Sequence, residues 1–245
     1  MRDMYFSITY HHFMLRTTLF LLFAAICRQT CFSQSKVFIT AEAGWSDDHY
    51  TMNDPGNSFL VPDAGSGYFG VTVGKMLKKH LYVETGIYTR KYSEYIQQVG
   101  SEGPSGGSGR RFAQIPLRVG GRWEFFGKRV AVRPYGGLVI NITGKNERWP
   151  SWFDYGPGVG PLLYTYKFRY PTDVFALAQA GMTLEYRIAK KVYLGVSSSY
   201  NWGFEKMMIQ DISYTLNGNA QKATSSSKGG FNSITASVSF RLGKE

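Results

Sequence analysis

The last part of the chain, Phe231–Leu242, alternates strictly between apolar and polar side chains. Its apolar positions are Ile234, Ala236, Val238, Phe240 and Leu242. The positions between them carry hydroxyl groups and one charge, at Ser233, Thr235, Ser237, Ser239 and Arg241. Because successive side chains of a β-strand point to opposite faces, this period of two predicts a strand with one apolar and one polar face.

Similar alternation recurs upstream and predicts eight strands in all. The expected strands are residues 36–45, 66–77, 81–97, 110–125, 130–143, 173–188, 192–202 and 231–242. Short basic turns alternate with long connections between them, which is typical of transmembrane barrels with periplasmic turns and extracellular loops. We therefore predict an all-β chain that forms an eight-stranded antiparallel up-and-down transmembrane β-barrel. Its last strand should pair with its first, because lipid tolerates no unpaired strand edge.

The faces expected to point into this barrel carry charges of both signs. They contain Glu42, Glu84, Arg90, Arg118, Arg122, Glu124, Arg133, Glu185 and Arg187. A soluble barrel, such as a lipocalin-like fold, would instead turn its apolar side chains inward. An eight-stranded barrel is only wide enough for its own side chains, so these residues predict an ion-pair network that plugs the lumen. The alternative is a narrow gated channel along the same residues.

Residues 1–34 have the features of a signal peptide, and residues 35–245 are expected to form one barrel domain. Leu19–Ile26 is an apolar run preceded by Arg16, and it is too short to span a membrane. These features predict export through the Sec pathway and a location in the outer membrane of a Gram-negative bacterium.

Met14 offers an alternative start, which would make residues 1–13 a misassigned extension. Cleavage of the signal peptide would remove Cys27 and Cys31, the two cysteines of the sequence. The mature chain is then expected to contain neither a disulfide nor a reactive thiolate. Neither cysteine lies in a lipoprotein acceptor context, so no lipid anchor is expected.

The composition favours β structure and a membrane environment over nucleic-acid binding. The chain contains 28 glycines, 17 tyrosines and 17 phenylalanines, and its net charge is +11. The basic residues are dispersed over turns, loops and alternating strand positions, and no nucleic-acid-binding motif accompanies them. We therefore expect no nucleic-acid partner.

Several segments of the chain resemble the outer-membrane β-barrel proteins of Bacteroidetes that are called PorT-like, within the wider OmpA/OmpX-like group. The segments are CFSQS at 31–35, FAQIPLRVGGRW at 112–123, VRPYGG at 132–137, AGMTLEYRI at 180–188 and SVSFRLGK at 237–244. The resemblance implies an eight-stranded barrel that the barrel assembly machinery inserts into the membrane. It implies no shared activity, because one fold carries many functions.

The third long connection, residues 144–172, is rich in aromatic side chains with basic neighbours. Its candidate interaction residues are Trp149, Trp152, Tyr155 and Tyr166. Such residues contribute large contact areas at interfaces, so they predict contact with lipopolysaccharide, a surface protein or a host component. The alternative is that they form the interface girdle and pack against residues 162–170, which are expected to extend the sixth strand.

An enzymatic site is the remaining alternative. His49 follows Asp47 and Asp48 at the expected outer rim, where serines of the second long loop could approach it to hydrolyse lipid A or peptide. The same residues, with Asp54, could bind a cation, although their spacing matches no known ligand motif. Because no catalytic motif supports this site, the sequence predicts a protein without enzymatic activity and without a cofactor.

Overall fold

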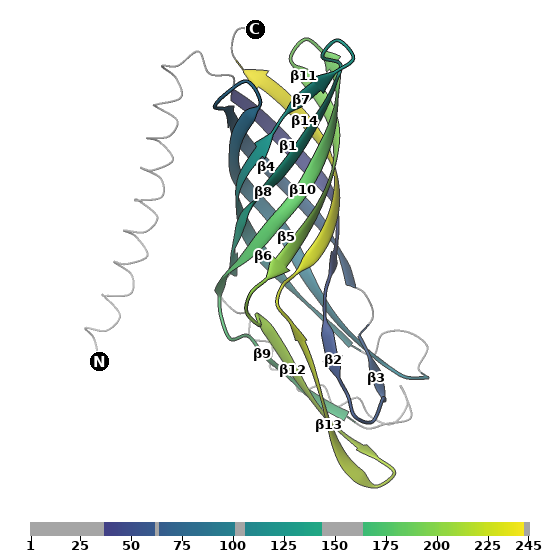
Figure 1. Cartoon of the computed structure of the whole chain (residues 1–245). Helices are drawn as coiled ribbons and strands as arrows, with labels where there is room; N and C mark the ends of the chain where they lie inside the picture. Colours follow the sequence, from purple (N-terminus) through teal and green to yellow (C-terminus); the bar gives the residue numbers. More distant parts are fainter. Residues whose placement is uncertain (1–36, 62–63, 101–105, 144–163, 243–245) are drawn as a thin grey trace, which may run out of the picture.

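The computed structural model describes residues 37–61, 64–100, 106–143 and 164–242 of the chain. Within these residues, eight long strands form a closed antiparallel barrel (Figure 1). They are β1 (Val37–Asp48), β4 (Ala64–Met76), β5 (Leu81–Gln98), β6 (Gly106–Gly121), β8 (Val130–Thr143), β10 (Val174–Ala189), β11 (Val192–Gly203) and β14 (Phe231–Leu242). The predicted fold class is confirmed. The signal peptide expected at residues 1–34 lies outside the described residues.

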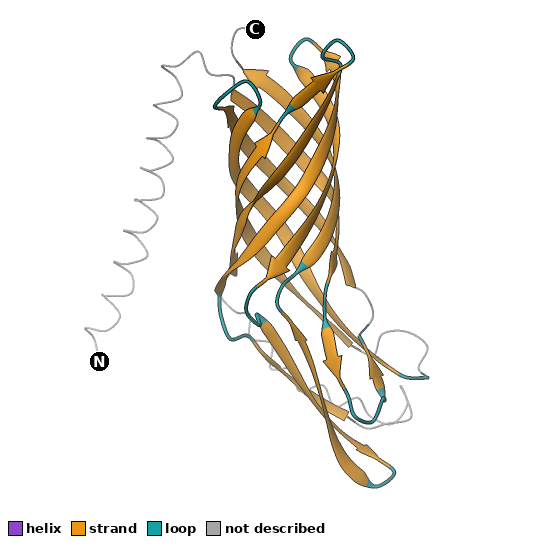
Figure 2. Ribbon diagram, in the orientation of Figure 1, coloured by secondary structure: helices purple, strands orange, loops and turns teal. Residues whose placement is uncertain are grey.

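The first and last strands close the barrel. Val37 pairs with Leu242, and Asp48 at the other end of β1 pairs with Phe231. Following the paired residues once around the barrel from Arg241 leads back to β14 at Phe231, a shift of ten residues along that strand. A shift of this size tilts the strands by roughly 40° from the barrel axis, as the oblique strands in Figure 2 show.

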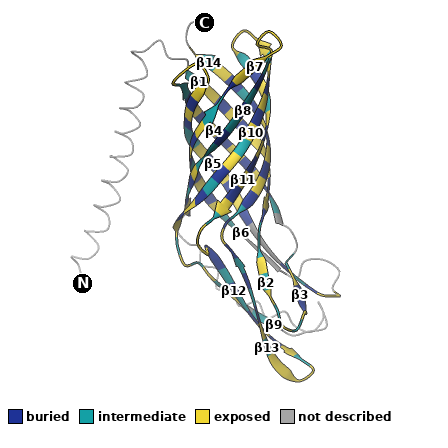
Figure 3. Cartoon of the chain, in the orientation of Figure 1, coloured by how far each residue is buried: buried dark blue, intermediate teal, exposed yellow. Residues whose placement is uncertain are grey.

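The two faces of the strands alternate as predicted (Figure 3). On β14, Ile234 is 65% exposed, whereas the neighbouring Ser233 and Thr235 are buried. The large apolar side chains that point outward on the barrel include Ile39, Phe69, Val71, Val73, Val83, Ile87, Leu117, Val119, Leu138, Met182, Leu184, Leu194, Val196 and Phe240. An apolar surface this large on the outside of a barrel indicates that the barrel is surrounded by the hydrocarbon of a membrane.

Inward-facing glycines make room for aromatic rings. A Cβ atom added at Gly70 would lie 2.0 Å from the ring of Tyr88, and one at Gly74 would lie 2.0 Å from the ring of Phe38. Glycine is therefore required at both positions, because the ring of a neighbouring strand lies across the backbone.

Short turns join the strands at the end of the barrel that holds the C-terminus, and long connections join them at the opposite end (Figure 1). In the turn between β6 and β8, the strand pairing is interrupted at Arg122 and resumes in β7 (Trp123–Phe125). No helix within the described ranges is long and apolar enough to cross a membrane.

The long connections build a second sheet beyond the barrel. It contains β2 (Thr51–Asn53), β13 (Asn219–Ser227), β12 (Met208–Leu216) and β9 (Tyr164–Arg169), in that order. A further short strand, β3 (Phe59–Leu60), pairs with the end of β5. One expectation is corrected here: β9 pairs with β12 instead of extending the sixth barrel strand. The last long connection forms a β-hairpin of β12 and β13.

This second sheet has a hydrophobic core of its own. Phe59 and Ile96, from the β3–β5 pair, pack with Tyr164, Ile212 and Tyr214 of the sheet. The ring of Phe59 contacts the rings of Tyr164 and Tyr214 edge to face, with centroids 5.1 Å apart in each pair. The connections therefore form a packed structure beyond the barrel, because buried aromatic contacts of this kind fix the two layers together.

Candidate functional site: the charged lumen and the extramembrane sheet

A chain of ion pairs crosses the lumen. Arg118 contacts Glu84 at 2.8 Å, and Glu84 contacts Arg133 at 2.6 Å. Arg133 also contacts Glu185 at 2.6 Å, and Glu185 contacts Arg122 at 3.0 Å. The side chains of all five residues are no more than 5% exposed. They come from different parts of the barrel wall, so the network ties its strands together across the lumen.

Glu42 completes the charge balance of this network. Its carboxylate lies 3.6 Å from Arg118. The three buried arginines thus face three buried glutamates. Buried charges are tolerated when they are paired and their remaining hydrogen-bonding groups are satisfied, which describes Glu84 here.

Aromatic rings fill the space between the charged groups. The Arg133 guanidinium lies 4.4 Å from the ring centre of Phe38 and 4.5 Å from that of Tyr82. Arg118 lies 4.7 Å from the ring centre of Tyr135. These cation–π contacts add attraction in a desolvated site, and they leave the guanidinium groups little room to change position.

Three of the predicted lumen residues are not among the five residues of this chain and lie nearer the two ends of the barrel. Arg90 hydrogen bonds to Asp48 at the opposite end of the barrel, with its guanidinium 3.8 Å from the ring centre of Phe231. Glu124 lies at the barrel mouth near the short turns, where it contacts Arg122 and lies 3.1 Å from Arg241. The predicted strand one ended before Asp48, so the sequence analysis missed this partner of Arg90.

Arg187, the third of these residues, lies at the same mouth and is only partly buried. It pairs with Tyr193 of β11, and the register of the two strands shifts only after it, between Arg187 and Ala189. Its Nη2 atom lies 3.5 Å from the carbonyl oxygen of Gly127 in the neighbouring turn. Arg187 keeps the inward-facing register opposite the buried Tyr193, but it lies at the mouth, beyond the five residues of the ion-pair chain.

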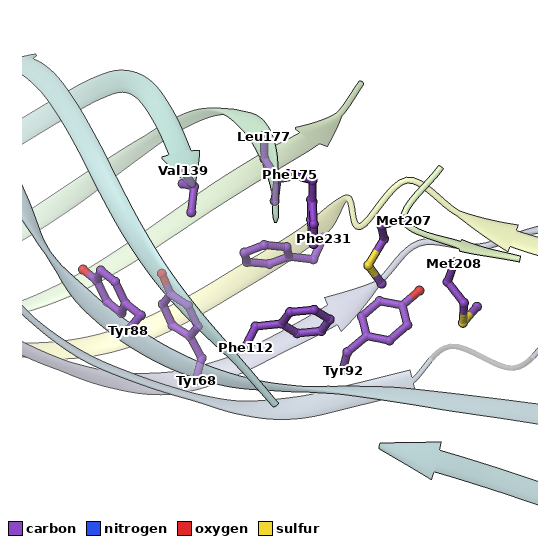
Figure 4. Close-up of a cluster of buried hydrophobic side chains, with 10 residues drawn as sticks. All are labelled: Tyr68, Tyr88, Tyr92, Phe112, Val139, Phe175, Leu177, Met207, Met208 and Phe231. Carbon is purple, nitrogen blue, oxygen red and sulfur yellow. The ribbon is translucent and has the colours of Figure 1, made fainter. Parts of the chain in front are cut away.

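In the half of the lumen nearer the long connections, apolar and aromatic side chains pack together (Figure 4), beside the buried Arg90–Asp48 pair. Tyr68, Tyr88, Tyr92, Phe112, Val139, Phe175, Leu177, Met207, Met208 and Phe231 form this buried cluster. The rings of Tyr68 and Tyr88 stack with centroids 4.7 Å apart. Two blocks of packed side chains, one charged and one apolar, therefore follow each other along the barrel axis.

A cavity of about 570 Å³ opens at the mouth near the short turns. Arg133 and Glu185 of the ion-pair chain line it, together with Lys78, Lys79 and Lys128 of the turns. The ion-pair chain thus separates this cavity from the apolar half of the lumen.

In the described part of the chain, Asp47, Asp48 and His49 of the candidate enzymatic site each contact a different partner. Asp47 accepts a hydrogen bond from the Trp45 indole at 2.9 Å, and Asp48 is bonded to Arg90. The His49 ring stacks on Tyr200 with centroids 5.5 Å apart, and within the described residues its Nε2 atom has no hydrogen-bond partner. Of the three candidate serines of the second long loop, Ser101 and Ser105 lie outside those residues, and Ser108 lies in β6, paired with Glu94 of β5.

Asp54 organises the first long connection instead of joining a cation site. Its carboxylate accepts hydrogen bonds from the backbone N–H groups of Ser58 at 2.6 Å and Phe59 at 2.9 Å, and also from the Tyr214 hydroxyl. Burial raises the pKa of Tyr214, and the bond to the Asp54 carboxylate raises it further. The described residues contain no group of three or more His, Cys, Asp or Glu side chains that could hold a metal ion.

Most of the aromatic residues predicted to form an interaction surface lie outside the described residues. Trp149, Trp152 and Tyr155 lie outside the described residues, and Tyr166 lies in β9, paired with Ile212 of β12. On the exposed face of the same sheet, Arg169 makes two hydrogen bonds to Asp211, at 2.7 and 3.1 Å.

The signal for the β12–β13 hairpin is present in the sequence. Asn217 and Gly218, which connect the two strands, both adopt positive φ, at 50° and 80°. An Asn-Gly pair between alternating segments is a strong indicator of a two-residue hairpin turn. The hairpin was not predicted because the β13 segment consists mostly of polar residues and lacks a clear apolar face.

The closed barrel, its apolar outer surface and its charged lumen define the chain as a small membrane-spanning β-barrel of the outer-membrane type. No family model and no curated protein matches its sequence. Among solved structures, the chain is similar to OprG from Pseudomonas aeruginosa, with a TM-score of 0.48, 10% identity, and coverage of 84% of this chain and 96% of OprG.

A major outer membrane protein from Thermus thermophilus matches with a TM-score of 0.47 and 12% identity, over 85% of this chain and 99% of that protein. Neisserial surface protein A matches with a TM-score of 0.40 and 11% identity, over 86% of this chain and 98% of that protein. At these values the likeness carries no conclusion about activity, ligands or the PorT-like resemblance.

Proposed function

We propose that this chain is a Gram-negative outer-membrane protein that conducts no solute and acts through its extracellular sheet, as a structural or interaction protein. The ion-pair chain through Glu84, Arg133 and Glu185 is the observation that carries the proposal. A diffusing ion would have to displace carboxylates that two arginines already hold. It would then meet the apolar cluster, where the loss of its hydration is costly.

The interaction half of the proposal rests on the extramembrane sheet. Its hydrophobic core gives it a defined shape, which reduces the entropy lost on binding. Its outer face carries exposed polar and charged groups, among them Lys167, Lys222 and the ion pair of Arg169 with Asp211. Partners that this basic and hydroxyl-rich surface fits are lipopolysaccharide, whose headgroups are anionic, or an acidic surface protein of the same cell or a host. In biogenesis, the barrel assembly machinery would insert the chain after Sec export.

Planar-bilayer recording tests the closed lumen. The purified protein should give no steady conductance steps, whereas a variant with the plug removed, Glu84→Ala with Arg133→Ala, should give small, frequent openings. Steady steps from the unmodified protein would favour the gated-channel alternative and overturn the proposal.

Charge reversal tests the interaction surface. Lys167→Glu with Lys222→Glu should weaken binding of the protein to immobilised lipopolysaccharide or to whole cells. The matched control, Lys78→Glu with Lys79→Glu, makes the same charge change at the opposite end of the barrel and should leave that binding unchanged. Equal binding by both variants and the unmodified protein would contradict a role for the outer face.

A further inference from the structure

Besides the lumen cavity, the barrel end near the short turns carries a second hollow, of about 550 Å³. It lies between the turn after β7 and the turn between β10 and β11. Its lining consists of Arg129, Tyr186, Arg187, Ile188, Ala189 and Lys190. We name it the turn hollow. The described residues that line it include three basic side chains and no carboxylate.

The turn hollow borders the apolar outer surface of the barrel. Tyr186 is 52% exposed and Ile188 is 53% exposed, and both point outward from β10. Basic groups therefore follow directly beyond side chains that face hydrocarbon. In a membrane, this is the level of the lipid headgroups, where Tyr is favoured and where Lys and Arg reach the phosphates.

Backbone contacts hold the hollow in shape. The N–H of Arg187 donates to the carbonyl oxygen of Arg129 at 2.7 Å, which ties the two turns together. The guanidinium of Arg187 donates to the carbonyl oxygen of Gly127 at 3.5 Å, which adds a second contact between β10 and the turn after β7. Arg129 and Lys190 of the two turns and Arg187 at the end of β10 thus line one hollow, and no carboxylate lines it to neutralise them.

We propose that the turn hollow is a binding site for the phosphate of an anionic membrane lipid. Two or three guanidinium and ammonium groups match a phosphodiester, since Arg binds phosphate oxygens in pairs and Lys adds a point charge. Tyr186 and Ile188 contact the glycerol and the first acyl carbons. The site rests on the membrane location proposed above, but not on which end of the barrel faces the periplasm.

Lipid binding to the full-length protein in a zwitterionic detergent tests the site, with native mass spectrometry counting the bound lipids. Phosphatidylglycerol should bind in preference to phosphatidylcholine of the same acyl chains. The test variant combines Arg129→Gln, Arg187→Gln and Lys190→Gln, and should lower the affinity for phosphatidylglycerol by at least about tenfold, since each cation near a headgroup contributes measurably.

The matched control makes the same change in charge at another place on the same end of the barrel. The variant with Lys78→Gln, Lys79→Gln and Lys128→Gln loses three cations at the same barrel end but outside the hollow, and should bind phosphatidylglycerol nearly as the unmodified protein does. Equal losses in both variants would show diffuse attraction and overturn the site. The double variant Arg129→Gln with Lys190→Gln retains the hydrogen bond from Arg187 to the Gly127 carbonyl, so the turn stays intact. It should still bind phosphatidylglycerol more weakly than the unmodified protein does, which shows that the loss comes from the missing cations and not from a disturbed turn.

Two further outcomes decide the source of the phosphate. Inorganic phosphate and glycerol phosphate at millimolar concentration should leave lipid binding unchanged. If they displace the lipid at that concentration, the hollow is a site for soluble phosphate and the lipid proposal fails. These results do not depend on conductance or on the extracellular sheet, so a failure here is distinct from a failure of the proposed function.

Discussion

Replacing Glu84 by Gln tests the account of the charged lumen most closely. Glu84 is the residue that joins Arg118, at 2.8 Å, to Arg133, at 2.6 Å, and its side chain is 3% exposed. The substitution keeps the volume and removes one of three buried negative charges, which leaves the network with one uncompensated positive charge. Removing one partner of a buried ion pair typically costs about 3–5 kcal/mol.

We therefore expect Glu84→Gln to lower the free energy of unfolding by about 3–5 kcal/mol at neutral pH. The double variant with Arg133→Gln restores the balance, because Glu42 still faces Arg118 and Glu185 still faces Arg122. It should be destabilised by clearly less than the sum of the two single variants, which a double-mutant cycle measures.

The assay is equilibrium unfolding by urea in lipid vesicles, followed by tryptophan fluorescence and by the gel shift of the folded barrel. Ser237→Ala serves as the control, because Ser237 is buried in the lumen and its hydroxyl has no hydrogen-bond partner within the described residues. It should change stability by no more than about 0.5 kcal/mol. A Glu84→Gln variant as stable as the control, or strictly additive single variants, would refute the reasoning.

Three further predictions concern other parts of the molecule. Gly70→Ala should destabilise the barrel by about 1–3 kcal/mol, because the new Cβ would lie 2.0 Å from the Tyr88 ring. Gly67→Ala on the same strand should be nearly neutral in the same unfolding assay, because a Cβ atom added there would have no other atom within 4 Å. Tyr214→Phe removes the hydroxyl that donates a hydrogen bond to Asp54. Loss of a bond worth about 1.5 kcal/mol should make the backbone amides of β12 and β13 exchange about ten times faster in a hydrogen-exchange experiment. Unchanged exchange rates would contradict the role of this bond. The pKa of Asp173 is lowered by hydrogen bonds from Arg110 and Thr143, so its small stabilisation is present above the ordinary value of 3.8 and is lost as the pH falls through the lower folded value. Asp173→Asn should lower stability slightly at about pH 6, and this difference should shrink as the pH falls below the ordinary value; a difference that grows on acidification would have the wrong sign.

The barrel was predictable because apolar and polar side chains alternate along each strand, since one face contacts lipid and the other faces the lumen. β8 and β14 have the predicted bounds, Val130–Thr143 and Phe231–Leu242. A one-residue slip would place glutamates in hydrocarbon, so the register is fixed by burial on both faces.

The remaining features depend on contacts between segments far apart in sequence. Arg90 contacts Asp48 across 42 positions, and that pairing follows from β1 continuing past Trp45. Arg187 follows the alternation, but it lies at the barrel mouth, where its guanidinium contacts the carbonyl oxygen of Gly127 in a neighbouring turn. The sheet beyond the barrel escaped prediction because its core residues are single aromatic and aliphatic side chains scattered over several polar connections.

The direction in which the strands point their side chains is the central claim, and spin labels on β14 measure it directly. Single cysteines at residues 235 to 240, in a chain with Cys27 and Cys31 replaced by serine, are labelled and reconstituted in lipid vesicles. The collision rate of each nitroxide with oxygen, which concentrates in hydrocarbon, is then recorded. The account predicts a maximum at Ala236, Val238 and Phe240 and a minimum at Thr235, Ser237 and Ser239. The opposite phase, or no alternation, would contradict it.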